Sequence, residues 1–176
     1  GYMLITLNKK QLEKALSLAI ARHDAKNVSF RNKDTAEFAN EAKESLAGKM
    51  DVSPQYMAHF IGVLGEMAWA IHSGDGMDEE IYAVRDGGED FVGLEVKTLT
   101  YFGAGEPELK IPESEFHKRT AVKTYVLARV NPKSPKKVEL LGKISRENFE
   151  KDMKSKKYGR YKPRNFVVPL SKMDSI

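Results

Sequence analysis

Four charged side chains in the middle of the sequence are of the types that hold a metal ion and hydrolyse a phosphate ester. They are Glu66, Asp90, Glu95 and Lys97. Carboxylate oxygens are the ligands that Mg²⁺ and Mn²⁺ prefer. A lysine beside them can balance charge or orient a water that the metal activates. The sequence therefore predicts a metal-dependent hydrolytic site, provided that the chain brings these residues together.

Glu66 lies within the most apolar helix that the sequence predicts. Ser53 is the expected N-cap, Pro54 takes the first helical position, and the run MAHFIGVLGEMAWAI is apolar nearly all round before Gly74 ends it. A carboxylate buried there must be neutralised, hydrogen-bonded, paired with a cation or bound to a metal. A structural ion pair is therefore the alternative to a metal site for this residue.

Glu95 and Lys97 project from the same face of a predicted strand. In GGEDFVGLEVKT, residues 87–98, side-chain alternation directs the apolar residues to one face and these two to the other. In a straight strand Asp90 would lie on the wrong face and roughly 16 Å from Glu95, at about 3.3 Å per residue. A tight turn at Gly93 would instead set Asp90 across from Glu95, and a bulge there would also correct the parity. Asp90 belongs to the site only if the chain bends at this point.

A Glu-x-Lys triplet is not specific by itself, because the chain contains two others. Glu41-Ala42-Lys43 lies on a predicted polar helix and Glu108-Leu109-Lys110 on a predicted short strand. Only the triplet at 95–97 is surrounded by an apolar strand, follows an Asp-Phe pair and comes after a helix with a buried glutamate. This context makes it the candidate for chemistry.

With Glu66 in a helix, then Asp90, then Glu95-Val96-Lys97, the chain resembles the PD-(D/E)XK restriction-endonuclease-like superfamily. The short spacing in DFVGLEVK is similar to that of the mismatch-repair strand-incision endonuclease and related restriction enzymes that cut GATC. The core of the family is a helix, three antiparallel strands, a second helix and a further strand, which corresponds to residues 53–130. No proline precedes Asp90, so Asp86 stays open as the alternative first metal ligand.

The resemblance implies a Mg²⁺-dependent (or Mn²⁺-dependent) endodeoxyribonuclease that leaves a 5′-phosphate. It implies that Asp90 and Glu95 hold the metal, with the Val96 carbonyl as a further ligand and Glu66 joining directly or through water. Lys97 would orient the attacking water or stabilise the transition state. The alternative is a catalytically inactive nucleic-acid-binding module of the same fold, in which the three carboxylates balance Lys97 in a buried ion network.

The order of predicted elements indicates a single α/β domain with a mixed sheet. The chain has 176 residues, of which 41% are hydrophobic, enough to bury a core. The resemblance implies a restriction-endonuclease-like core, in which helices flank a central mixed β-sheet. We expect an N-terminal helical part over residues 1–50, a catalytic core over 53–130, and a basic strand-helix-strand extension over 131–176.

The expected elements follow from hydrophobic periodicity, capping residues and turn residues. Predicted helices cover residues 8–25, with Asn8 as the N-cap, and also 34–47, 53–73, 114–123, and 145 to about 156. Predicted strands cover residues 81–85, 90–99 as one or two strands, 109–111, 124–130, 138–144 and 166–170.

The net charge of +4 hides an asymmetry between the two parts of the chain. Residues 1–105 hold 11 Lys/Arg against 16 Asp/Glu, a balance of −5, whereas residues 106–176 hold 18 against 9, a balance of +9. The densest basic stretch, residues 143–164, carries nine basic residues with Tyr158 and Tyr161 between them. Such a mixture suits backbone phosphates, and a solvated surface is the alternative.

We expect DNA as the partner. Its contacts are assigned to basic residues in two places, the helix predicted over residues 114–123 and the basic C-terminal stretch. The expected nucleic-acid-binding residues are Lys118, Arg119, Lys123, Lys156, Lys157 and Arg160. Whether the substrate is DNA or RNA, and whether one or both strands are cut, stays open. A homodimer would suit an enzyme that cuts both strands, although no residue demands one.

Composition excludes several other classes of site. The chain contains no cysteine, so disulfides, thiolate zinc sites and cysteine nucleophiles are absent. Its four histidines show no metal-ligand spacing. No apolar run reaches eighteen residues and the start lacks the layout of a signal peptide. We therefore expect a cytoplasmic protein, intracellular and not secreted, with no membrane partner.

Overall fold

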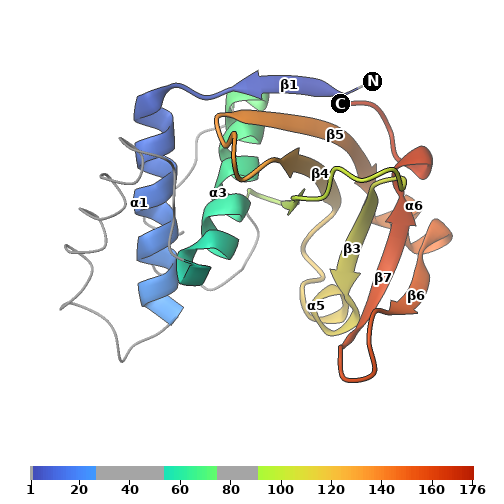
Figure 1. The fold of residues 1–176 in the computed structure, drawn as a ribbon. Coiled ribbons are helices and arrows are strands. Elements are labelled where there is room, and N and C mark those ends of the chain that lie inside the picture. Colours follow the sequence, from blue (N-terminus) through green and yellow to red (C-terminus); the bar gives the residue numbers. More distant parts are fainter. Residues whose placement is uncertain (1, 27–53, 75–90) are drawn as a thin grey trace.

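The computed structural model describes residues 2–26, 54–74 and 91–176, and its elements form three layers. Helices α1 (Lys9–Lys26) and α3 (Pro54–Ser73) make the first layer. They cover one face of a four-stranded sheet, and a three-stranded sheet packs on the other face (Figure 1). The chain is therefore mixed α/β with a mixed sheet flanked by helices, as the sequence predicts.

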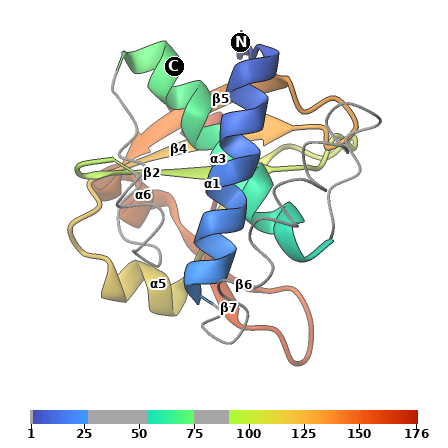
Figure 2. The ribbon, with the colours of Figure 1, turned by 90° about the vertical axis from the view of Figure 1, so that its left-hand side faces the viewer.

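The four-stranded sheet has the order β1-β5-β4-β2. Its strands are β1 (Met3–Thr6), β5 (Lys137–Ser145), β4 (Thr124–Val130) and β2 (Leu94–Leu99). The pairs β1/β5 and β5/β4 are antiparallel, whereas β2 runs parallel to β4. Figure 2 shows α1 and α3 in front of this sheet. Strand β5, which the sequence analysis assigned to the C-terminal extension, lies inside the sheet between β1 and β4.

The three-stranded sheet has the order β3-β7-β6 and is antiparallel. Its strands are β3 (Glu108–Pro112), β7 (Arg164–Pro169) and β6 (Lys154–Lys157), and a short 3₁₀ helix, η2 (Leu170–Lys172), follows β7. We expected β3 to continue an antiparallel run with the Glu-x-Lys strand, but it pairs with β7. The exposed loop over residues 100–106 carries the chain from one sheet to the other.

Strand β4 separates two hydrophobic cores. Its side chains alternate between them, with Val126 and Ala128 packed toward α1 and α3, and Tyr125 and Leu127 packed toward the second sheet. Both faces of the strand are buried, which confirms the prediction of a buried strand over residues 124–130. The second core is lined by β3, β7 and two short helices, α5 (Glu113–Lys118) and α6 (Arg146–Asp152).

Helix α1 begins, and helix α3 ends, where the capping residues predict. Asn8 and Gln11 exchange hydrogen bonds of 2.8 Å between side chain and backbone at the start of α1, which is a capping box. At the end of α3 the Gly74 amide donates to the Ala70 carbonyl over 3.0 Å, and Gly74 has φ +78°. A left-handed residue at this position is the usual role of glycine after a helix.

Two helices are shorter than predicted. Helix α5 ends at Lys118 instead of continuing to residue 123. Helix α6 starts as predicted, with the Ser145 hydroxyl accepting from the Asn148 amide over 3.1 Å, but it ends at Asp152. The following lysine-rich segment was expected to be helical and forms β6 instead, because β7 supplies its backbone hydrogen bonds. Strands β1 and β6 were not predicted, since both are short and largely exposed.

Several predictions lie outside the described residues. These are the helix at 34–47, the strand at 81–85, the N-cap Ser53, and the alternative ligands Asp86 and Asp90. None of the helices within the described ranges is long and apolar enough to cross a membrane.

Candidate functional site

Strand β2 directs the Glu-x-Lys side chains away from α3. Helix α3 packs closely on the opposite face of the strand, where a Cβ on Gly65 would overlap the Thr98 side chain and touch Val96. Glu95 and Lys97 alternate with these residues and face the second sheet. Lys97 Nζ lies 3.7 Å from Glu95 Oε1, so the two side chains meet as the strand pattern predicts.

A tight turn precedes the strand at the point where a bend was required. Phe91 and Leu94 exchange backbone hydrogen bonds of 3.0 and 3.2 Å, and Gly93 between them has φ +70°. Glycine adopts this conformation without the strain that a Cβ would cause. The bend at Gly93 is confirmed, whereas Asp90 itself lies outside the described residues and its role stays a prediction.

Helix α5 and the residue after it add two charged groups to this face of β2. Lys97 Nζ lies 2.7 Å from Glu115 Oε1. Arg119 Nη1 donates to Glu95 Oε1 over 3.0 Å and to Glu115 Oε1 over 2.8 Å. We call Glu95, Lys97, Glu115 and Arg119 the β2–α5 cluster. Two carboxylates and two cations alternate in it, so each charge has opposite charges beside it.

Glu115 was missed by the sequence analysis, and Arg119 was assigned a different role. The signal for both was the spacing of four residues between them, which places an acid and a base on one side of a helical turn. Arg119 was predicted to contact nucleic acid, but in the structure its guanidinium binds two carboxylates. It is therefore part of the candidate site.

Arg146 fixes the position of α5. Its Nη2 donates to the Phe116 carbonyl over 2.7 Å, and its Nη1 donates to the Arg119 carbonyl and the Tyr125 hydroxyl, each over 3.1 Å. The guanidinium also lies 3.9 Å from the centre of the Phe116 ring. Because arginine donors satisfy the last carbonyls of a helix, this residue holds Glu115 and Arg119 against β2.

Burial and charge act in opposite directions on the carboxyl of Glu115. Burial raises its pKa, but the charge and hydrogen bond of Lys97, together with Arg119, outweigh burial and leave the pKa below its ordinary value. Glu115 is therefore an anion at neutral pH. Burial raises the pKa of Tyr125 to about 12, against the charge of Arg146 and with the help of Glu95 and Glu115. The phenol thus stays protonated beneath the cluster.

The cluster extends from the interior to the surface. The side chain of Glu95 is 5% exposed and that of Glu115 18%, whereas Lys97 and Arg119 are 27% and 29% exposed. A solvent-borne ion or a phosphate group can therefore meet the two cations first and the carboxylates behind them.

Glu66 lies on the other face of the sheet. It is buried, and its two carboxylate oxygens accept from the Arg22 guanidinium over 3.2 and 2.9 Å. The pair joins α1 to α3, so this contact corresponds to the structural ion pair that the sequence left open. Val96, expected as a carbonyl ligand, lies in β2 beside Glu95, and its side chain is buried on the α3 side.

The donor chemistry of the cluster suits a hard divalent cation in part. The Oε1 atoms of Glu95 and Glu115 converge, since both lie within 3.0 Å of Arg119 Nη1. Mg²⁺ commonly binds one or two carboxylates and completes its shell with water and substrate phosphates. Within the described residues no group of three or more His, Cys, Asp or Glu could hold a metal. Two carboxylate ligands fit, provided that the Arg119 guanidinium moves away from them.

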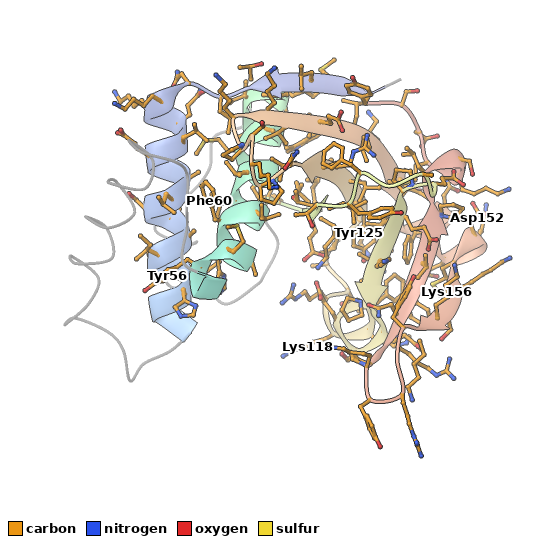
Figure 3. The ribbon with its side chains drawn as sticks, in the orientation of Figure 1. Tyr56, Phe60, Lys118, Tyr125, Asp152 and Lys156 are labelled. Atoms are coloured by element: carbon orange, nitrogen blue, oxygen red, sulfur yellow. The ribbon has the colours of Figure 1, made fainter. Side chains whose placement is uncertain are left out.

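The remaining predicted DNA contacts lie on the surface around the three-stranded sheet. Lys118 and Lys123 are exposed at and after the end of α5, and Lys156 and Lys157 are exposed on β6. Figure 3 labels Lys118 and Lys156 among the side chains of this part of the molecule. Arg160 lies in the turn between β6 and β7.

No family model, curated protein or solved structure matches this chain.

Proposed function

We propose that this protein is a Mg²⁺-dependent endonuclease that hydrolyses phosphodiester bonds in DNA, with the β2–α5 cluster as its catalytic centre. The observation that carries the proposal is the pairing of an acid and a lysine from one Glu-x-Lys strand, with Lys97 Nζ 3.7 Å from Glu95 Oε1. The resemblance to the PD-(D/E)XK superfamily requires this arrangement. A second carboxylate, Glu115, stands beside the pair.

In this proposal Glu95 and Glu115 hold the metal, and Asp90 joins them as the resemblance implies. When bound, the ion would lower the pKa of a coordinated water and neutralise charge on the phosphate. Glu115 would take the metal-ligand role that the sequence suggested for Glu66. Glu115 lies on the same side of β2 as Glu95 and is held as an anion. The ligand role of Glu66 remains a prediction that competes with this one.

The two cations of the cluster have separate tasks. Lys97 donates to the attacking water or to a phosphate oxygen, which keeps positive charge beside the reacting group. Arg119 now bridges the two carboxylates, so it must release them when the metal binds. A guanidinium freed in this way is suited to a phosphate through paired hydrogen bonds. Arg119 thereby keeps the substrate contact that the sequence predicted.

Incubating the protein with supercoiled plasmid DNA and Mg²⁺ or Mn²⁺ tests the proposal. The parent should convert the plasmid to nicked or linear DNA, and Lys97→Ala and Glu95→Gln should not. Lys133→Ala is the control, because Lys133 is an exposed lysine in the turn between β4 and β5, outside the β2–α5 cluster. Intact plasmid with the parent protein, or equal cutting by Lys97→Ala, would contradict the proposal.

The second candidate is a nucleic-acid-binding module without catalysis. The observation that favours it is the mutual neutralisation of the cluster, in which Lys97 and Arg119 already pair with both carboxylates. A thermal unfolding series with added Mg²⁺ separates the two candidates. A metal site should stabilise the fold by about 2.7 kcal/mol at a hundred times its dissociation constant. A closed ion network predicts no specific gain.

A further inference from the structure

A basic hairpin projects from the second sheet. It comprises residues 154–164, which are β6, the turn after it and the first residue of β7. It carries six basic residues and no acidic one. In Figure 1 the turn extends past α5 at the lower edge of the molecule. Its charge complements a polyanion, because lysine and arginine that neutralise phosphates release counterions.

The root of the hairpin is anchored to β3. Lys156 Nζ lies 3.3 Å from Glu108 Oε2, and the Tyr158 hydroxyl donates to the same oxygen over 3.4 Å. Lys110 Nζ lies 4.3 Å from the centre of the Tyr158 ring, and the Ser155 hydroxyl donates to Glu113 over 2.9 Å. Tyr158 is therefore a structural residue of the second sheet, and the anchored root gives the turn a defined position.

Tyr161, in the turn between β6 and β7, takes no part in these anchoring contacts. Its side chain is 89% exposed, and its contact within the described chain is the Arg160 guanidinium, 5.6 Å from the ring centre. Lys157 and Lys162 belong to the same hairpin, and within the described ranges neither is held by an ion pair. An exposed aromatic ring in a basic hairpin is the combination that binds single-stranded nucleic acid, in which bases stack on aromatic rings.

The exposed ring distinguishes an unpaired strand from a duplex. Phosphates occur in both, so the basic residues alone would bind both. In a duplex each base is stacked on its neighbours, whereas an unpaired base offers its face to an aromatic side chain. Tyr161 therefore gains a partner only where the nucleic acid carries an unpaired base.

Helix α5 connects the hairpin to the β2–α5 cluster. The Phe116 and His117 rings of α5 lie 5.3 and 5.5 Å from the Phe166 ring of β7. Glu115 is the neighbour of Phe116 in the chain. Tyr161 precedes Phe166 by five residues, which an extended strand spans in at most roughly 17 Å. Tyr161 therefore lies within this distance of the part of β7 that contacts α5.

From these observations we propose that the basic hairpin binds an unpaired DNA segment adjoining the duplex at the cluster, with Tyr161 stacked on one of its unpaired bases. The inference takes DNA as the substrate from the proposed function and adds a preference for junctions between paired and unpaired DNA. It concerns binding, so it is testable without cleavage.

The test is fluorescence anisotropy in EDTA, which removes divalent metal and prevents cutting. The probes are a blunt duplex and the same duplex with a single-stranded tail at one end. The parent should bind the tailed probe more tightly. Tyr161→Ala should weaken that binding roughly 5- to 100-fold and leave the blunt probe unchanged, since stacking on one base has this magnitude. Tyr161→Phe should retain most of the affinity.

Tyr2→Ala is the matched control, because Tyr2 is also an exposed tyrosine, 58% exposed, and lies beside β1 in the other sheet. It should bind both probes as the parent does. Equal affinity of the parent for the two probes, or equal behaviour of Tyr161→Ala and Tyr2→Ala, would overturn the inference.

A pair of charge variants tests the phosphate contacts. Replacing Lys157 and Lys162 together by alanine should lower the salt dependence of binding to both probes, by a slope of up to about 2. Lys133→Ala, an exposed lysine in the turn between β4 and β5, should not change it. If neither DNA shows salt-sensitive binding, the inference fails and an acidic protein surface becomes the better partner. A parent that prefers the tailed probe in EDTA, but cuts neither the probes nor plasmid DNA when Mg²⁺ or Mn²⁺ is added, supports the inference and contradicts the endonuclease proposal.

Discussion

Two buried carboxylates of this protein, Glu66 and Glu95, differ in what surrounds them. The exposed fractions of the two whole residues are nearly equal, 2% for Glu66 and 4% for Glu95. Within the described residues, Glu66 accepts two hydrogen bonds from the Arg22 guanidinium, which joins two helices. Glu95 lies on the opposite face of the sheet, where a second carboxylate and two cations share its contacts.

The depth of burial therefore does not distinguish a structural carboxylate from a candidate catalytic one. What differs is how many carboxylates share one cation and how exposed that cation is. Arg22 is 14% exposed, whereas Lys97 and Arg119 are 27% and 29% exposed and lead to the surface. A bidentate pair between packed helices holds the fold together. A shared, reachable cluster can exchange its cation for another.

The largest effect is expected from removing Arg22. Arg22→Ala should lower the free energy of unfolding by about 3–5 kcal/mol, because it leaves Glu66 buried without its guanidinium. Urea denaturation measures this loss. Lys10→Ala, an exposed basic residue of α1, should stay within about 0.5 kcal/mol of the parent. The double variant Arg22→Met with Glu66→Met should recover much of the lost stability. An Arg22→Ala variant as stable as the parent would show that the pair does not stabilise the fold.

A smaller effect is expected from removing Lys97, and it should concern the rate of cleavage and not the stability of the fold. Lys97→Ala should reduce the rate of DNA cleavage roughly 10²- to 10³-fold, as does loss of a single group that stabilises charge in a transition state. Single-turnover cleavage with saturating Mg²⁺ measures it. The control Lys133→Ala, an exposed lysine between β4 and β5, should cut at nearly the parent rate, and a comparable loss in both variants would argue against a special role for Lys97.

The Mg²⁺ dependence of DNA cleavage should differ between substitutions on the two faces of the sheet. Glu115→Gln should raise the Mg²⁺ concentration for half-maximal cleavage at least about 10-fold, since a carboxylate ligand becomes a neutral amide. Glu66→Gln should leave that concentration unchanged in the fraction that stays folded. The opposite result, with Glu66→Gln altering the Mg²⁺ dependence and Glu115→Gln not, would restore Glu66 as the ligand.

The smallest effect is expected from protonating Glu115. Its pKa lies below the ordinary value of 4.5 in the folded protein, so its ionised form stabilises the fold above that pH. This part of the stability should be lost as the pH falls below 4.5 and through the lower folded pKa. Denaturation at a series of pH values should show a shallower acid decline for Glu115→Gln. Identical declines in both proteins would mean that the cluster does not stabilise the anion.

Much of the local structure was predictable from neighbouring residues. The limits of β4, the cap at Asn8, the end of α3 at Gly74 and the bend at Gly93 all agree with the sequence pattern. Side-chain alternation also put Glu95 and Lys97 on one face. These features depend on backbone periodicity and on glycine conformation, which a few consecutive residues specify.

The partners of the charged groups were not predictable in this way. Glu66 meets Arg22 from 44 positions earlier, and Glu95 meets Arg119 from 24 positions later. Strand β3 pairs with β7 instead of β2. In each case the sequence defines a group that needs a partner, because an unpaired buried charge or strand edge is costly. Which partner supplies it depends on how helices and sheets pack, and that packing put Glu66 and Glu95 on opposite faces of one sheet.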